Sequence, residues 1–285
     1  MLFRSIDDLV IELANTPTLS VNNNVNFGTV RVGTSNSENV TVTNTGDSGS
    51  TLAGNIQFAP GGSEFSPQSG AQNFSLTQNQ SSSRTFTYSP VNSGIDSQNI
   101  TIVNNTGDNE TVTLQGNGVS PTFNSSLAPD STVDFGMIHL NTSVADHPDI
   151  PPTKYETITI SNITADADLG NLTDLSILNA FIAGDGSFDI IDFTPTVLGK
   201  GKSLDLTIRF STIMAHNGGV SPSKGIKNAV LTLVTDQNAA FGETGDEFTF
   251  NLAGQIIPEP NTTILAGLAF LFCIFGYKKE EVIGK

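Results

Sequence analysis

The segment Val25-Asn-Phe-Gly-Thr-Val-Arg-Val-Gly-Thr34 decides the fold, because it recurs 108 residues later as Val133-Asp-Phe-Gly-Met-Ile-His-Leu-Asn-Thr142. Both copies begin with apolar residues that alternate with polar ones, as in a strand with one buried face. Similar segments at a fixed offset are typical of a folding unit that occurs twice. The pair therefore predicts two related β units in tandem.

Four more pairs of similar segments follow in the same order along the chain. They are residues 39–46 with 156–162, 84–90 with 205–211, 98–104 with 228–234, and 111–116 with 248–254. The second copy is longer because of insertions near 145–154, 166–187 and 214–227. Since the order is kept throughout, we expect matching segments to form matching strands.

The matched segments show period-two alternation bounded by turn signals. Val40, Val42 and Asn44 are expected on one face of a strand, with Thr41 and Thr43 on the other. Clusters of Asn, Gly and Asp at 44–47, 104–108 and 184–186 predict turns. About seven short strands per ~100 residues predict two tandem immunoglobulin-like antiparallel β-sandwiches.

The predicted organisation has four parts. They are a lead at 1–20, a sandwich at 21–120, a longer sandwich at 121–257, and a terminal segment at 258–285 that ends in a single hydrophobic helix. A short linker at 118–121, which contains a proline, joins the sandwiches. The Cys…Trp…Cys signature of antibody domains is absent from the sequence, so the relation to antibody domains concerns architecture only.

Composition excludes several classes of function. The 285 residues include 12 Lys and Arg against 28 Asp and Glu, a net charge of −16, which argues against nucleic acid as a partner. Cys273 is the single cysteine, so an intrachain disulfide is excluded, and we interpret it as an apolar packing residue. His139, His147 and His216 are scattered without metal-ligand spacing. We therefore expect no cofactor.

The repeat motifs point to a known family. Phe27-Gly-Thr-Val-Arg-Val-Gly-Thr34, the Asn44-Thr-Gly46 turn, Phe86-Thr-Tyr-Ser-Pro90 and the closing Leu114-Gln-Gly-Asn-Gly118 resemble the choice-of-anchor D module. That module is similar to the abnormal-spindle/hydin type of Ig-like domain. The second copy keeps Asp134-Phe-Gly136 and Leu252-Ala-Gly254 but loses the Asn-Thr-Gly turn. The resemblance implies a non-enzymatic Ig-like scaffold of the kind found in exported bacterial proteins.

The C-terminal segment suggests where the protein is located in the cell. Pro258, Glu259 and Pro260 precede an apolar run at 264–277 and the basic pair Lys278 and Lys279. By length alone, ~24 Å of helix suits a buried or transient helix as well as a membrane span. The order resembles the PEP-CTERM sorting signal of bacterial surface proteins. This resemblance implies recognition of the tripeptide by an exosortase-type transpeptidase, retention of 264–277 in the inner membrane, and a stop at the lysines.

The sorting interpretation predicts transit through the inner membrane, then residence at the cell surface or in an extracellular matrix. A plain tail anchor fits the same apolar run. At the other terminus, Asp7, Asp8 and Glu12 interrupt any apolar core, so residues 1–14 do not form a secretory signal. We therefore hypothesise that the true start of the protein lies upstream.

Two motifs resemble catalytic sites but suit turns better. Gly46-Asp-Ser-Gly49 has the sequence around a protease nucleophile, yet no histidine precedes position 139. Gly199-Lys-Gly-Lys-Ser203 resembles part of a P-loop, but Thr196 replaces its first glycine and a strand follows. We therefore expect no catalytic activity, although spacing alone does not exclude the paired-carboxylate cleft of a lyase or hydrolase.

The acidic loops leave one binding alternative open. The loops at 166–168, 185–189 and 243–247 carry carboxylates that could bind Ca²⁺, although solvated loop charges account for them as well. We expect a scaffold or adhesion module that contacts other surface proteins or extracellular polysaccharide. The alternative is a polysaccharide-binding module, with calcium as an aid.

Overall fold

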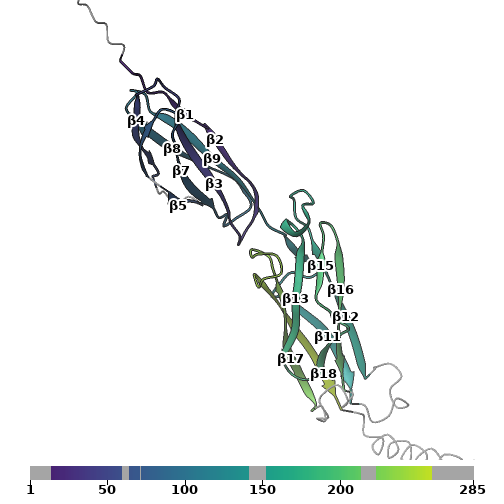
Figure 1. Ribbon diagram of the computed structural model, residues 1–285. Helices are drawn as coiled ribbons and strands as arrows, with labels where there is room; N and C mark the ends of the chain where they lie inside the picture. The colour runs from purple at the N-terminus through teal and green to yellow at the C-terminus, as the bar shows by residue number, and fades with distance from the viewer. Residues whose placement is uncertain (1–13, 60–63, 71, 141–151, 213–222, 259–285) are drawn as a thin grey trace, which may run out of the picture.

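The computed structural model describes residues 14–59, 64–70, 72–140, 152–212 and 223–258. These residues form two β-sandwiches placed end to end along an elongated molecule (Figure 1). Each sandwich has a four-stranded and a five-stranded sheet around its own apolar core. The all-β sandwich prediction is therefore confirmed.

The first sandwich contains strands β1 to β9. Its four-stranded sheet has the order β1 (Leu19–Val21), β3 (Asn36–Asn44), β7 (Ser81–Tyr88), β5 (Phe65–Gly70). Its five-stranded sheet has the order β2 (Asn24–Arg31), β9 (Glu110–Val119), β8 (Gly94–Asn104), β4 (Thr51–Gln57), β6 (Asn73–Thr77).

The second sandwich repeats this topology strand by strand. The smaller sheet has the order β10 (Phe123–Ser125), β12 (Thr153–Asn162), β16 (Ser203–Ser211), β14 (Phe188–Ile191). The larger has the order β11 (Thr132–His139), β18 (Glu247–Ile257), β17 (Gly225–Thr235), β13 (Leu175–Gly184), β15 (Thr196–Leu198). A short 3-10 turn, η1 (Gly170–Leu172), precedes β13. All five pairs of repeated segments fall on equivalent strands.

Two details of the strand prediction were wrong. Each sandwich has nine described strands instead of about seven, because short edge strands escape a pattern that needs several residues. The sheets are also not wholly antiparallel, since β2 pairs with β9, and β11 with β18, in parallel.

The repeated motif that opens each copy encodes a bulge in the parallel pair. Gly28 and Gly136 have φ of 72° and 63°, where the ladder register shifts. The side chain of the residue two positions earlier, Asn26 or Asp134, accepts a hydrogen bond from the glycine N–H at 2.8 Å. The Asx-Phe-Gly sequence thus turns the strand while its Phe stays in the core.

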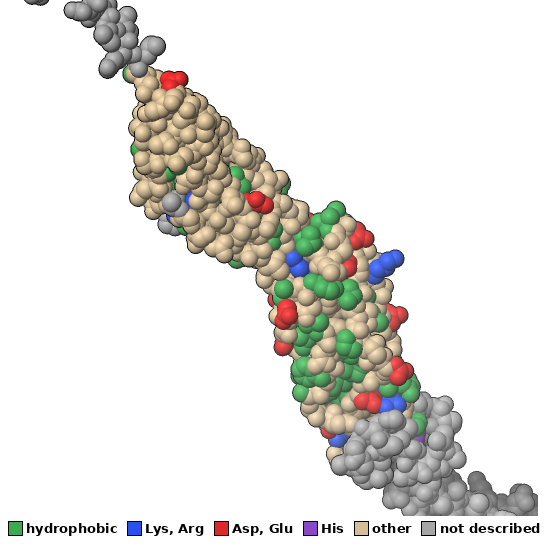
Figure 2. Space-filling view, viewed as in Figure 1, with side chains coloured by type: hydrophobic (Ala, Val, Ile, Leu, Met, Phe, Trp, Pro, Cys, Tyr) green, Lys and Arg blue, Asp and Glu red, His purple; other side chains and the backbone are tan. Residues whose placement is uncertain are grey.

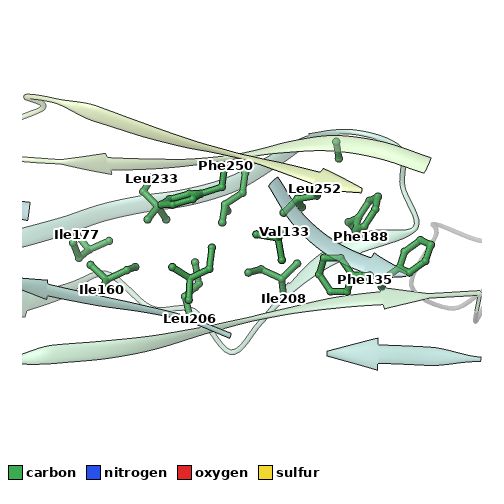
Figure 3. Packing of buried hydrophobic residues seen from close by; sticks show 14 of the residues in the cluster. Val133, Phe135, Ile160, Ile177, Phe188, Leu206, Ile208, Leu233, Phe250 and Leu252 are labelled. Carbon is green, nitrogen blue, oxygen red and sulfur yellow. The ribbon is translucent and has the colours of Figure 1, made fainter. Parts of the chain in front are cut away.

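An aromatic triad anchors each core. In the second sandwich, Phe188 stacks on Phe210 with ring centroids 4.7 Å apart, and Phe135 packs against both rings. Figure 3 shows this core between the two sheets, with Phe135 and Phe188 at one end. The first sandwich has the same triad, formed by Phe27, Phe65 and Tyr88.

The triads correct the alignment of the repeats. Tyr88 corresponds to Phe210, whereas the sequence match placed it opposite Arg209. The match of 98–104 with 228–234 is displaced by one residue as well, since Gln98 and Ala229 both pair with the equivalent leucine of the last strand. A slip of one residue exchanges the buried and exposed faces of a strand, and composition alone does not reveal it.

A buried asparagine closes each sandwich at one corner. Asn44 and Asn162 are both 0% exposed at the ends of β3 and β12. The Nδ2 of Asn162 donates to the carbonyl oxygens of Thr173 (2.8 Å) and Leu198 (2.9 Å), while its Oδ1 accepts from the N–H of Thr164 (3.1 Å). The second copy loses the Asn-Thr-Gly sequence but keeps the function of its asparagine.

Several predicted features lie outside the described residues. These are Cys273, His147, His216, Glu259, Pro260, the apolar run 264–277, Lys278, Lys279 and residues 1–13. Pro258 is described, and it is exposed just after β18. Within the described ranges, no helix has the length and apolar character that crossing a membrane requires.

Candidate interaction surface

The two motifs that resemble catalytic sites lie in turns, as predicted. Residues 46–49 connect β3 to β4, and the N–H of Gly46 donates to Oδ1 of the buried Asn44 at 3.0 Å. Residues 199–202 connect β15 to β16, where Gly201 has φ of 71° and donates its N–H to the Asn162 carbonyl oxygen at 2.8 Å. Each segment therefore donates a backbone hydrogen bond to a buried corner asparagine, Asn44 or Asn162.

The segment 185–189, expected to be a loop, runs into β14, and its carboxylates contact basic side chains. Asp185 Oδ2 lies 3.1 Å from Lys227 Nζ, and Asp189 Oδ1 accepts from Arg209 Nε at 2.9 Å. Burial raises the pKa of Asp185, but the hydrogen bonds from Ser187 and Lys227 together outweigh it and lower that pKa. Hydrogen bonding to Asp189 raises the pKa of Arg209. Across the described part of the chain, no three His, Cys, Asp or Glu side chains gather as metal ligands would.

An acid pair that sequence reasoning missed lies at the end of the first sandwich. Tyr88 Oη donates to Asp96 Oδ2 at 2.5 Å, and Glu64 Oε1 accepts from the N–H of Val91 at 2.9 Å. Burial, followed by the hydrogen bond between Glu64 and Asp96, raises the pKa of Glu64. The pKa of Tyr88 is raised as well, first by burial and then by Asp96. Burial and the neighbouring carboxylate therefore both disfavour the charged form of Glu64.

A second unpredicted feature is an apolar patch on the outside of the larger sheet of the second sandwich. Phe181, Val197 and Val230 point away from the core and are 43%, 51% and 36% exposed. Ala183 pairs with Val230 across β13 and β17, and Ala253 lies on the same outer surface of β18. We call these five residues the apolar sheet face. None of them is charged.

The first sandwich carries polar residues at the positions equivalent to four of these five residues. Strand pairing equates Phe181 with Gln57, because each lies opposite a threonine at the same place in the ladder. By the same register, Val230 corresponds to Asn99, whose Oδ1 accepts from the Thr113 hydroxyl at 3.0 Å. The other two pairs are Val197 with Ser75 and Ala253 with Gln115. Ala183 has no paired counterpart, because the equivalent ladder of the first sandwich ends at Gln57. The fold itself therefore does not require apolar residues here.

The apolar sheet face is also slightly hollowed. A shallow groove of about 470 Å³ is lined by Ala183, Val230 and Ala253 of this face and by the polar residues Asn228 and Asn251. Figure 2 shows apolar side chains gathered over the second sandwich, whereas fewer are visible on the first. Exposed apolar side chains gathered on one face are found at interaction sites of soluble domains.

Comparison with known proteins supports the fold of the first sandwich. Residues 17–117 match the family model described as the HYDIN/CFA65/VesB-like, Ig-like domain. None of the curated proteins matches the chain. The match confirms the Ig-like prediction for the first copy, while the choice-of-anchor D assignment stays a prediction.

Solved structures give only distant similarity. A protein of unknown function from Porphyromonas gingivalis W83 is 14% identical, with 83% of this chain and 99% of that chain covered and a TM-score of 0.30. The Vibrio cholerae VesB protease is 18% identical over 35% of this chain and 31% of its own, with a TM-score of 0.30. The titin I-band fragment I67-I69 is 10% identical over 87% and 67%, with a TM-score of 0.32. Such scores carry no functional conclusion, and the family match alone places an Ig-like domain in this chain.

Proposed function

We propose that this protein is a non-catalytic, exported bacterial surface or matrix protein, an Ig-like scaffold that contacts other molecules through the apolar sheet face. The observation that carries the proposal is the replacement of Gln57 and Asn99 of the first sandwich by Phe181 and Val230 of the second. At these two positions the first copy carries polar residues, although Ile95 on the same outer side of β8 is 74% exposed. Apolar residues at the same positions are explained by a partner that covers them.

The energetics suit a contact surface. Full burial of a Phe or Val side chain contributes about 1.5–3 kcal/mol, so covering the exposed part of each would contribute about 1 kcal/mol. Since the chain has a net charge of −16, an uncharged face also allows close approach without bringing carboxylates together. Several such contacts, repeated over many tethered copies, would hold a matrix together.

The proposed localisation depends on the terminal segment. Pro258, Glu259 and Pro260 would be recognised by an exosortase-type enzyme, residues 264–277 would be held in the inner membrane, and Lys278 with Lys279 would stop transfer. The mature protein would then reside at the cell surface or in the extracellular matrix. This part of the proposal rests on the sequence resemblance alone.

Cell fractionation with intact-mass analysis tests the proposed localisation and processing. We expect mature protein outside the cell that ends at or just before Pro258-Glu-Pro260. Full-length protein in the membrane would reduce the segment to a plain tail anchor. Full-length protein in the cytosol would refute the surface assignment.

Variants taken from the protein's own first copy test the apolar sheet face. The double variant Phe181→Gln/Val230→Asn should be released from the matrix into the medium while keeping the wild-type melting temperature. Ile95→Asn is the matched control, because Ile95 is 74% exposed on the first sandwich and lies off this face. Retention equal to wild type in the double variant would refute the contact role. Loss of binding to purified extracellular polysaccharide in the same variant would instead favour the polysaccharide-binding alternative.

A further inference from the structure

One side chain of the first sandwich belongs, by its contacts, to the second. Arg31 is the last residue of β2 and is 1% exposed. Its Nε donates to the carbonyl oxygen of Ala239 at 2.7 Å, and its Nη1 to those of Asn171 (2.7 Å) and Asp174 (2.9 Å). Its Nη2 lies 3.0 Å from both the carbonyl oxygen and Oδ1 of Asp236. These five acceptors match the five N–H groups of a guanidinium.

The acceptors are organised within the second sandwich. Asp236 is 0% exposed, and its Oδ1 and Oδ2 accept from the N–H groups of Ser176 (2.8 Å) and Gly242 (2.9 Å). On the other side, the N–H of Asp174 donates to the Gly170 carbonyl oxygen at 2.8 Å, which fixes the turn around η1. Two loops of the second sandwich thus form a pocket lined with carbonyl oxygens, independently of Arg31.

A cation is required there by electrostatics. A buried carboxylate and four carbonyl oxygens that converge without a cation would be strongly unfavourable. Burial lowers the pKa of Arg31, and Asp236 partly offsets this effect. The guanidinium also lies 5.7 Å from the ring centroid of Phe241, within range of a cation–π contact. An ammonium offers only three donors and no planar fork, so the pocket is specific for guanidinium.

The neighbouring residues let the two sandwiches meet closely. A Cβ on Gly33 would lie 2.7 Å from the Cα of Ala239, so only glycine fits beside the loop. In the linker, Ser120 Oγ accepts from the N–H of Asn238 at 3.2 Å. The residue equivalent to Arg31 in the second sandwich is His139, so the strand itself does not demand an arginine.

We propose that the loop end of the second sandwich, formed by residues 169–174 and 236–242, is a guanidinium-binding socket, and that Arg31 fills it in this chain and thereby locks the two sandwiches into one rod. The socket is a ligand site with its own specificity, so another guanidinium should enter it when Arg31 is removed.

Chemical rescue of Arg31→Ala in the full chain tests the socket. The variant should melt about 10 °C below wild type, because a buried carboxylate loses its partner. Methylguanidinium at millimolar concentration, far below denaturing levels, should raise its melting temperature in a saturable way, by about 4 °C at ten times the dissociation constant. The same salt should not raise the melting temperature of wild type.

Arg84→Ala is the matched control, since Arg84 donates to a single carbonyl oxygen, that of Ile56, within the first sandwich. It should show no rescue. The socket is refuted if Arg31→Ala melts like wild type, if it is destabilised without rescue, or if the salt raises the melting temperature of all three proteins alike.

Arg31→Lys keeps the test decisive should the alanine variant not fold. Lysine retains the charge but fills only part of the socket, so this variant should melt several degrees below wild type. Small-angle scattering should show a broader distribution of interatomic distances, because the joint bends. Wild-type melting and scattering for Arg31→Lys would show that charge alone suffices and would overturn the proposal.

Discussion

Replacing the corner asparagine of the second sandwich should destabilise the protein strongly. In Asn162→Ala, the carbonyl oxygens of Thr173 and Leu198 lose their donors at 2.8 and 2.9 Å, and both residues are at most 3% exposed. Each buried group left without a partner costs about 1–3 kcal/mol. We therefore expect the free energy of unfolding to fall by about 3–5 kcal/mol, or the melting temperature by about 10 °C.

Urea unfolding of the full chain, followed by circular dichroism, measures this change. Asn124→Ala is the control, because Asn124 is exposed on β10, and it should stay within about 0.5 kcal/mol of wild type. Asn44→Ala should resemble Asn162→Ala, since Asn44 donates to the Leu76 carbonyl oxygen at 3.0 Å in the same corner of the first sandwich. A loss below 1 kcal/mol for Asn162→Ala would show that water replaces the side chain, and the corner would then not depend on asparagine.

Two further predictions concern crowding and charge. Gly254→Ala should lower the free energy of unfolding in urea by about 1–3 kcal/mol, because its Cβ would lie 2.5 Å from Cε1 of the buried Phe210. Gly186→Ala is the control and should not change the stability, because there is open space around Gly186. Equal stability of the two variants would contradict this packing argument. Because the pKa of Glu64 is raised in the folded state, its stabilising contribution is complete below its unfolded pKa and is lost as the pH rises through the folded value. Glu64→Gln, which can donate to Asp96 at any pH, should thus be more stable than wild type at neutral pH and lose that advantage in acid. Melting curves across the pH range measure this difference, and a difference that does not change with pH would contradict the raised pKa of Glu64.

Much of the fold could be predicted from local patterns. Alternation of Val40 and Val42 with threonines predicts a strand with one buried face, and both valines are 0% exposed. The repeated Asx-Phe-Gly segments identify two copies of one unit, and those segments do form equivalent strands with equivalent bulges. These features are local, since pleat and turn chemistry depend on residues within a few positions of one another.

The candidate surface could be predicted only in part, because the register of strand pairing decides which residues of a strand face outward. Phe181 and Gln57 occupy equivalent positions, yet β13 contains an irregularity between Ile177 and Asn179 that a sequence match does not locate. Before the pairing is known, an alternating strand has two faces, and either could be the core face. The acid pair likewise joins residues far apart in the sequence, because Glu64 lies just before β5 and Asp96 lies in β8.

The sequence by itself thus determined the strands, the turns and the tandem repeat. It also gives the chain a net negative charge, which argues against nucleic acid as a partner. Only the tertiary structure decided what Arg31 does. In the sequence it is one polar residue at the end of a strand, but its partners lie 140 to 208 residues away, in loops of the other sandwich. Such a site arises when chain connectivity brings two finished domains together. No periodicity encodes that event, because four of the five acceptors are backbone carbonyl oxygens, whose residue types are free to vary, and the fifth is a single distant carboxylate.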